Sequence, residues 1–242
     1  MAFSPVCIGS HYAVRTKALR QIGGVGPELA EDFTTSYLLN VAGWRGVFAI
    51  DAAAHGDGPP SFAAMVTQEF QWSRSLMKAL MHLVLRTWRR LPTTLGLRFI
   101  VQSGSYLLFS LMVVGGVLLF ATATATRSPW VAVNVVTFFA LWLTMSLWML
   151  LVAFLLRRNG LLRPIESPII SWQRALYVGS RFPFVLLGVA AAIMESIVPR
   201  TIDFKVTPKG DVGPQPFPVR LVIPFVVVTV ILAGSASIGR SR

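Results

Sequence analysis

The sequence predicts two structural parts, the end of an α/β domain and, after it, an α-helical membrane domain with interfacial helices. The chain of 242 residues is 54% hydrophobic and 13% charged, whereas an ordinary soluble domain is about 25% charged. Three long runs, 99–126, 128–156 and 221–239, contain no charged residue. The first 60 residues instead mix short helix signals with one strand signal and a turn cluster.

Residues 1–60 are predicted to be the last part of a larger α/β domain. Helices are expected over 12–21 and 30–42, because glycines follow both segments. Glu31 and Asp32 lie at the start of the second segment, where acids suit the helix dipole. The apolar run 47–50 predicts a strand, and 56–60 predicts a turn. About 60 residues seldom form a stable core alone, so the beginning of this domain is expected outside the sequence.

Residues 61–95 are predicted to form one amphipathic helix at the membrane interface. Apolar residues recur at helical spacing from Phe62 to Val84, with basic residues among them. Trp72 and Trp88 are of the kind found at the boundary between membrane and water. Pro92 is expected to end the helix, because proline lacks the backbone N–H that a helix interior needs.

Residues 96–242 are predicted to form the transmembrane domain. About 20 apolar residues cross a bilayer, and spans are expected at about 99–122, 130–155 and 219–237. The uncharged run 182–194 is shorter than a span. Residues 171–198 are therefore predicted to be an interfacial or re-entrant helix that Pro183 kinks or breaks. A polar loop, 203–216, precedes the last span.

The formal net charge of +12 does not indicate a nucleic-acid partner, because the basic residues cluster beside the apolar runs. Basic residues precede the first run and follow the second, whereas Arg127 is alone between them. By the positive-inside rule, residues 1–98 and the stretch after 156 are expected in the cytoplasm, and Arg127 outside. Cys7 is the only cysteine, which excludes an intrachain disulfide.

Four motifs in order carry a resemblance to a known family. Gly9-Ser10 opens a segment, 9–24, that is similar to the family's acceptor-side segment, and Ala30-Glu31-Asp32 is similar to its Thr-Glu-Asp motif. Residues 68–72 (Gln-Glu-Phe-Gln-Trp) are similar to Gln-x-x-Arg-Trp, and residues 204–209 fit Phe-x-Val-Thr-x-Lys. Together they resemble the C-terminal portion of a processive family 2 glycosyltransferase of the bacterial, cellulose synthase-like type. The resemblance implies that 1–60 is a remnant of a GT-A-type catalytic domain, and that 96–242 forms a channel.

The resemblance implies roles for the residues of the first three motifs. A sugar hydroxyl is a poor nucleophile, so a general base must take its proton; Asp32 would be that base and Glu31 its neighbour. Trp72 would stack on the terminal sugar of the acceptor, and Gln68 would help to hold a substrate. Without the resemblance, Asp32 reads as an acid at a helix start and Trp72 as a membrane anchor.

Position 71 departs from the family pattern. The family has an arginine there that contacts the nucleotide diphosphate, and Gln71 offers only a neutral amide. Arg74 lies nearly on the same helix face and either takes over this contact or extends to lipid headgroups. The resemblance also implies a gating loop that closes over the nucleotide. Its residues are Phe204, Val206, Thr207 and Lys209 within 203–216; a merely basic loop beside the membrane is the alternative.

The implied function is an inverting hexosyltransferase that polymerises a β-linked polysaccharide and translocates it. The resemblance implies as partners a nucleotide sugar (a UDP-sugar), the growing glycan and the bilayer of the bacterial inner membrane. Mg²⁺ would be held by an Asp-x-Asp motif that this sequence lacks, so no metal ligands are expected here, and the donor-binding half would lie elsewhere, for example in a separate chain. The alternatives are a non-catalytic membrane subunit of a polysaccharide synthase and a small transporter unrelated to glycans.

Overall fold

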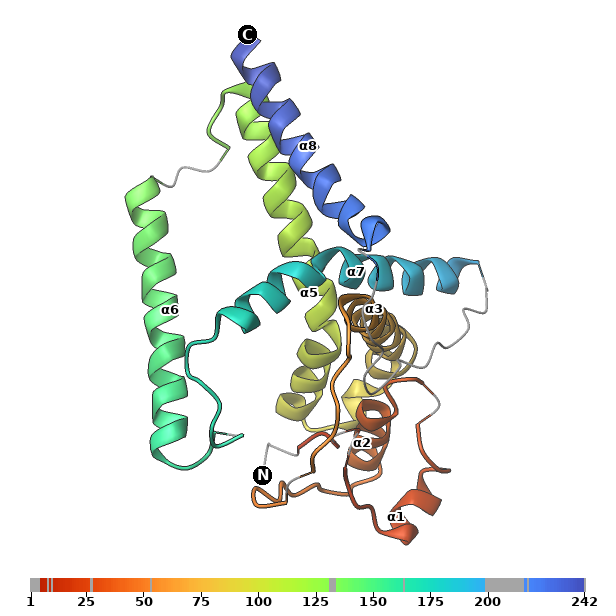
Figure 1. Ribbon diagram of the computed structural model, residues 1–242. Helices are drawn as coiled ribbons and strands as arrows, with labels where there is room; N and C mark the ends of the chain where they lie inside the picture. The colour runs from red at the N-terminus through yellow and green to blue at the C-terminus, as the bar shows by residue number, and fades with distance from the viewer. Residues whose placement is uncertain are drawn as a thin grey trace. The chain divides into compact units, whose positions relative to one another are not determined.

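The computed structural model is built from helices (Figure 1). It describes residues 5–7, 9, 11–26, 28–52, 54–130, 134–162, 164–198, 216 and 218–241. The α-helices are α1 (Thr16–Gln21), α2 (Glu31–Val41), α3 (Phe62–Ala79), α4 (Leu85–Thr87), α5 (Thr93–Thr126), α6 (Val135–Arg158), α7 (Trp172–Ile197) and α8 (Val219–Ser241). A π-helical turn, η1 (Leu80–Val84), and a 3₁₀ turn, η2 (Trp88–Arg90), flank α4. The chain divides into two compact units, 1–115 with 181–227 and 116–180 with 228–242.

The prediction of an α/β remnant is wrong. No residue of the described ranges belongs to a strand, and His11 alone forms an isolated bridge. The predicted strand at 47–50 is irregular chain, with Val47 91% and Phe48 55% exposed. A strand needs a neighbour to pair its backbone N–H and C=O groups. Since no second strand accompanies this run in the described chain, four apolar residues are not enough to form a sheet.

The two short helices of the N-terminal part are confirmed, with shifted starts. α1 begins at Thr16 rather than at position 12, after an extended Arg15. α2 begins at Glu31, so both acids occupy its first turn. Gly24 and Gly43 follow the two helices with φ of 114° and 86°, a backbone conformation in which glycine carries no steric penalty.

The predicted amphipathic helix is nearly continuous from Phe62 to Arg90. Ser61 caps its start, since its side-chain oxygen accepts a hydrogen bond from the Ala64 N–H at 3.2 Å. Pro92 follows the last turn, as expected for a residue that cannot continue a helix. Periodicity did not predict the π-helical turn at Leu80–Val84, which inserts a wider turn without changing the apolar pattern.

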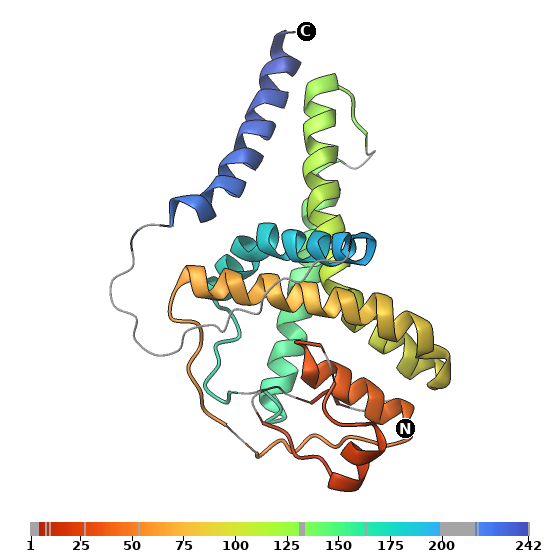
Figure 2. The same cartoon turned by 90° about the vertical axis from the view of Figure 1, so that its right-hand side faces the viewer.

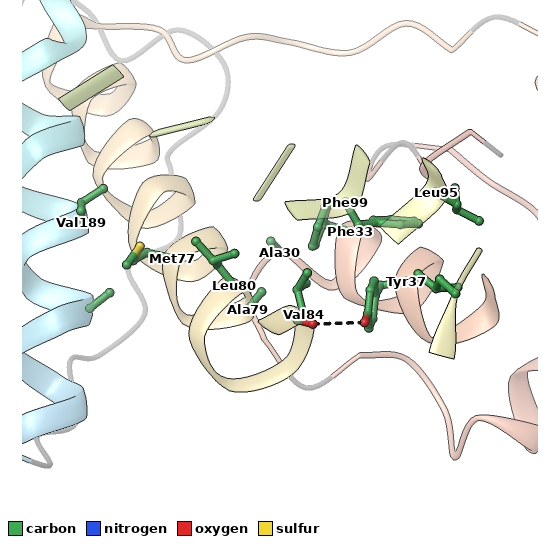
Figure 3. Close-up of a cluster of buried hydrophobic side chains, with 12 residues drawn as sticks. Ala30, Phe33, Tyr37, Met77, Ala79, Leu80, Val84, Leu95, Phe99 and Val189 are labelled. Carbon is green, nitrogen blue, oxygen red and sulfur yellow. Dashed lines mark hydrogen bonds between the residues drawn. The ribbon is translucent and has the colours of Figure 1, made fainter. Parts of the chain in front are cut away.

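A cluster of buried aromatic and aliphatic side chains joins α2 to this helix and to α5 (Figure 3). Phe33 and Tyr37 of α2 meet Phe99 of α5 edge to face, with ring centroids 5.6 and 5.1 Å apart. The buried Tyr37 hydroxyl lies 2.8 Å from the Thr87 hydroxyl and donates to the Val84 carbonyl oxygen at 3.4 Å. Burial raises the pKa of Tyr37, while its hydrogen bond with Thr87 opposes that rise. The cluster therefore fixes α2 against the end of the amphipathic helix.

α3 packs against α7 within the first unit (Figure 2). Gly188 of α7 is the closest point, because a Cβ added there would collide with the Ser73 side chain and the Phe70 carbonyl. Pro183 lies inside α7, yet the helix continues through it. The predicted break is therefore absent, and the alternative, a kink at Pro183, stays a prediction. Pro183 is itself buried. Its packing offsets the free energy that the helix loses because proline has no backbone N–H to donate.

Gly188→Ala is expected to destabilise the first unit by about 1–3 kcal/mol, because the new methyl group overpacks the contact between α7 and α3. Gly179→Ala is the matched control on the same helix, since a Cβ there meets nothing within 4 Å. The control should be neutral or slightly stabilising, because alanine favours helix by up to about 1 kcal/mol over glycine. Chemical unfolding of both solubilised variants measures the difference; equal stabilities would refute the close contact.

Four helices, α5, α6, α7 and α8, are long and apolar enough to cross a membrane. Three agree with the predicted spans. The fourth, α7, was predicted not to cross, and its length and composition also allow a span, so the prediction of an interfacial helix stays a prediction. Such a set of helices is that of an integral membrane protein.

In the second unit, α5 and α8 run side by side around Thr124 (Figure 1). The Thr124 and Ser235 hydroxyls lie 2.9 Å apart, and Gly239 allows the Thr124 carbonyl a close approach. The Arg127 guanidinium donates to the Arg240 carbonyl at 2.9 Å, near the end of α8. Small residues and interhelical hydrogen bonds are the usual basis of helix packing in a membrane.

Candidate functional site

The two acids of the predicted catalytic motif begin α2, and α3 holds that beginning in place. The Ser75 hydroxyl accepts a buried hydrogen bond from the Ala30 N–H at 2.8 Å, across 45 residues of sequence. Asp32 Oδ1 accepts from the Phe33 N–H at 2.7 Å. Glu31 and Asp32 are half-buried, so both side chains keep part of their surface exposed to solvent.

Cys7 and Gly9 lie against this acidic turn. The Cys7 N–H donates to the Ser36 hydroxyl at 2.6 Å, one turn of α2 beyond Asp32. A Cβ added to Gly9 would lie 3.2 Å from Asp32 Oδ2. Glycine at position 9 therefore allows the chain to pass close to this carboxylate, and its place in an acceptor-side segment stays a prediction.

Tyr12 is a neighbour of the acidic turn that sequence reasoning missed. Burial raises the pKa of its hydroxyl, and the negative charges of Cys7, Glu31 and Asp32 raise that pKa further, against a hydrogen bond with Thr35. The side chain remains 38% exposed. No spacing in the sequence marks it, because its approach to α2 comes from an irregular segment.

The third motif lies on one face of α3, which we call the motif face: Gln68, Gln71, Trp72 and Ser75. These positions repeat at intervals of three and four residues and so share one side of the helix. Because Ser75 binds the Ala30 backbone, the motif face is turned toward the start of α2. Trp72 is 42% exposed and Gln71 is 7% exposed, so Trp72 offers a flat surface for a ligand and Gln71 lies inside.

Arg74 points away from the motif face. Its Nε donates to Glu195 Oε1 at 2.6 Å and its Nη2 donates to Glu195 Oε2 at 2.8 Å, a two-pronged ion pair with α7. Lys78 joins the same group, at 3.5 Å from Glu28 and 4.0 Å from Glu195. A diphosphate contact by Arg74, predicted as a replacement for the missing arginine at 71, would require it to leave Glu195.

Glu69 forms a second link to α7 that the sequence reasoning did not propose. Its side chain is 1% exposed and lies 3.4 Å from Arg181 Nη1. The Arg181 guanidinium also lies over the Tyr106 and Phe109 rings of α5, at 5.9 and 5.2 Å from their centroids. A signal was present: Arg181 is the single charge between Arg174 and Glu195, and arginines in apolar helices are usually paired.

The predicted gating-loop residues Phe204, Val206, Thr207 and Lys209 lie outside the described residues. Within the part of the chain that the structure describes, no three His, Cys, Asp or Glu side chains are grouped to hold a metal. The sequence also has no Asp-x-Asp motif. The described residues therefore do not fit a complete Mg²⁺ centre, and the chemistry below uses side chains alone.

The candidate site therefore consists of the acidic turn at the start of α2 and the exposed Trp72 of α3. A comparison with known families identifies the class of protein. The model of glycosyl transferase family group 2 matches residues 1–156, which is more than half of the chain. The chain therefore belongs to this glycosyltransferase family, as the motifs predicted. No solved structure matches it.

Proposed function

We propose that this chain carries the acceptor side of a membrane-embedded, inverting hexosyltransferase. The observation that supports this most is the hydrogen bond between Ala30 and Ser75. It holds the acidic turn beside the motif face, so a carboxylate and an exposed aromatic ring border the same region. Family membership and the four apolar helices agree with a transferase that works at a membrane.

In the proposed reaction, Asp32 accepts the proton of the acceptor hydroxyl as that oxygen attacks the anomeric carbon of the donor sugar. The bond from the anomeric carbon to the diphosphate breaks, and the nucleotide diphosphate leaves. Trp72 stacks on the acceptor sugar, Gln68 hydrogen-bonds at its edge, and Glu31 adds negative charge next to the base. Gln71 reaches a substrate only if its buried side chain turns outward. Arg74 shapes α3 through Glu195 and meets the diphosphate only if that pair opens.

The donor is proposed to be a nucleotide sugar, with a UDP-sugar as the first candidate, and the product a β-linked polysaccharide that passes through the membrane helices. The proposed topology places residues 1–98 on the cytoplasmic face of a bacterial inner membrane, in keeping with the basic residues before α5. Phe204, Val206, Thr207 and Lys209 are proposed to close over the bound nucleotide. The donor and its Mg²⁺ are proposed to be held by residues outside this sequence, in the same or another polypeptide.

The test is incorporation of radiolabelled sugar by the chain in lipid nanodiscs, supplied with UDP-glucose, UDP-galactose or UDP-N-acetylglucosamine and Mg²⁺. We expect no polymer from residues 1–242 alone. We expect synthesis when a family 2 domain with an Asp-x-Asp motif is joined to the chain or expressed with it. Turnover by 1–242 alone would overturn the assignment of donor binding to other residues. Synthesis that is equally fast with and without this chain would favour a non-catalytic subunit.

A further inference from the structure

The basic residues of the helical stretch from Phe62 to Arg90 fall into two groups that the sequence does not distinguish. The sequence has no acidic residue from Phe70 to Ile165, so any acidic partner must come from elsewhere in the chain. Arg74 and Lys78 have such partners in Glu195 and Glu28. These two cations are therefore paired with carboxylates inside the protein.

Three arginines form the second group, which we call the basic turn: Arg86, Arg89 and Arg90. All three are exposed, and none has an ion pair within the described residues. They occur within five consecutive positions at α4 and η2. Like charges at this spacing repel one another, so an uncompensated group of this kind favours an anionic partner.

The fold holds the basic turn at the start of a membrane helix. Three apolar side chains that follow the turn are buried: Leu91 is 6% exposed, Leu95 is 8% exposed and Phe99 is 1% exposed. Gly96 allows α5 to approach the turn closely, because a Cβ there would lie 2.9 Å from the Trp88 carbonyl oxygen. α5, which is long and apolar enough to cross a membrane, begins at Thr93. The arginines are thus fixed three to seven residues before the start of that helix.

The side chains around the arginines suit the boundary between headgroups and lipid tails. Leu85 is 50% exposed directly before Arg86, so an apolar group stands beside the charge. Trp88 is half-buried, and the Arg89 guanidinium lies 5.8 Å from its ring centroid. Tryptophan prefers this boundary, and a guanidinium binds phosphate oxygens through paired N–H groups.

We propose that the basic turn binds the phosphate headgroups of anionic phospholipids and thereby sets the depth of α3 and α5 at the membrane surface. This goes beyond sugar transfer, because it requires no nucleotide. Each arginine near the surface adds to the attraction for anionic lipid. Loss of all three should therefore weaken lipid binding on the order of a hundredfold at low salt. The attraction should fall as salt rises, because ions screen exposed charges.

The experiment uses the full chain in phosphatidylcholine nanodiscs that contain a small fraction of dansyl-labelled phosphatidylglycerol. Energy transfer from tryptophan reports enrichment of the labelled lipid around the protein. Unlabelled phosphatidylglycerol and inorganic phosphate are added as separate competitors. We compare the wild type with R86Q/R89Q/R90Q and with R15Q/K17Q/R20Q, which removes three exposed charges from the first helix and its N-cap.

We expect the wild type and the R15Q/K17Q/R20Q control to enrich the anionic lipid, and the R86Q/R89Q/R90Q variant to lose that enrichment without loss of thermal stability. Equal enrichment by all three proteins would overturn the proposal. So would an equal loss in both triple variants, which would indicate a net-charge effect. Displacement of the lipid by inorganic phosphate would assign the turn to free phosphate rather than to headgroups.

Discussion

Arg181→Gln is expected to lower the free energy of unfolding of the first unit by about 3 kcal/mol, near the lower end of the range for broken buried ion pairs. Glu69 is 1% exposed and lies 3.4 Å from Arg181, so the substitution leaves a carboxylate inside the protein without this cation. The lower end of the range applies because the Arg181 side chain is 23% exposed and water partly screens its charge. The contacts of its guanidinium with Tyr106 and Phe109 are lost as well.

The control for this prediction is Arg174→Gln, on the same helix. Arg174 is exposed, so its removal changes the net charge equally and should cost under about 1 kcal/mol. Denaturant unfolding of the solubilised full chain compares the two. If both variants had the same free energy of unfolding, the ion pair between Arg181 and Glu69 would not contribute to the stability of the protein.

A double-mutant cycle separates the pair from the rest of the contact. Glu69→Gln combined with Arg181→Gln replaces both charges with neutral amides, and we expect it to recover part of the loss seen in Arg181→Gln. Pairs in contact typically show an interaction energy of 0.5–3 kcal/mol in such a cycle. Strict additivity of the two single substitutions would contradict a direct interaction between Glu69 and Arg181.

Helical periodicity and charge-free runs predicted most of the elements but not how they pack. The spans, the amphipathic helix and its end before Pro92 were predictable, because each depends on local composition. The strand at 47–50 was predicted wrongly, since a short apolar run gains strand structure only from a partner elsewhere. The continuation of α7 through Pro183 also depends on tertiary packing, here burial of the proline itself, which no local rule contains.

The roles of the candidate site residues stay predictions, and their contacts could not be predicted. The motifs that contain Asp32 and Trp72 pointed to the family, and the family model matches residues 1–156. The partner of Arg74 could not be read in the same way, because Glu195 is 121 residues away. The approach of Tyr12 to the acidic turn depends on irregular chain, for which sequence has no periodic signal.

Asp32→Asn is expected to reduce kcat of the complete enzyme by 10²–10⁴-fold, which is the usual contribution of a general base. The change is nearly isosteric, and its amide oxygen can still accept the 2.7 Å hydrogen bond from the Phe33 N–H. The start of α2 should therefore keep its position against Ser75, and KM for the acceptor should change little. Initial rates of sugar transfer, measured with this chain joined to a family 2 domain that carries an Asp-x-Asp motif, separate kcat from KM.

Asp57→Asn is the matched control, because Asp57 is an exposed loop residue that undergoes the same change of charge. We expect its kcat to equal that of the wild type. A fall in kcat with unchanged KM, seen for Asp32→Asn and not for Asp57→Asn, assigns the proton transfer to Asp32. If Asp32 only stabilised the start of α2 through the helix dipole, its loss would instead lower the stability of the protein by about 1 kcal/mol. Polymer synthesis at the wild-type rate by Asp32→Asn would remove Asp32 from the mechanism and leave the acidic turn as a structural feature of α2.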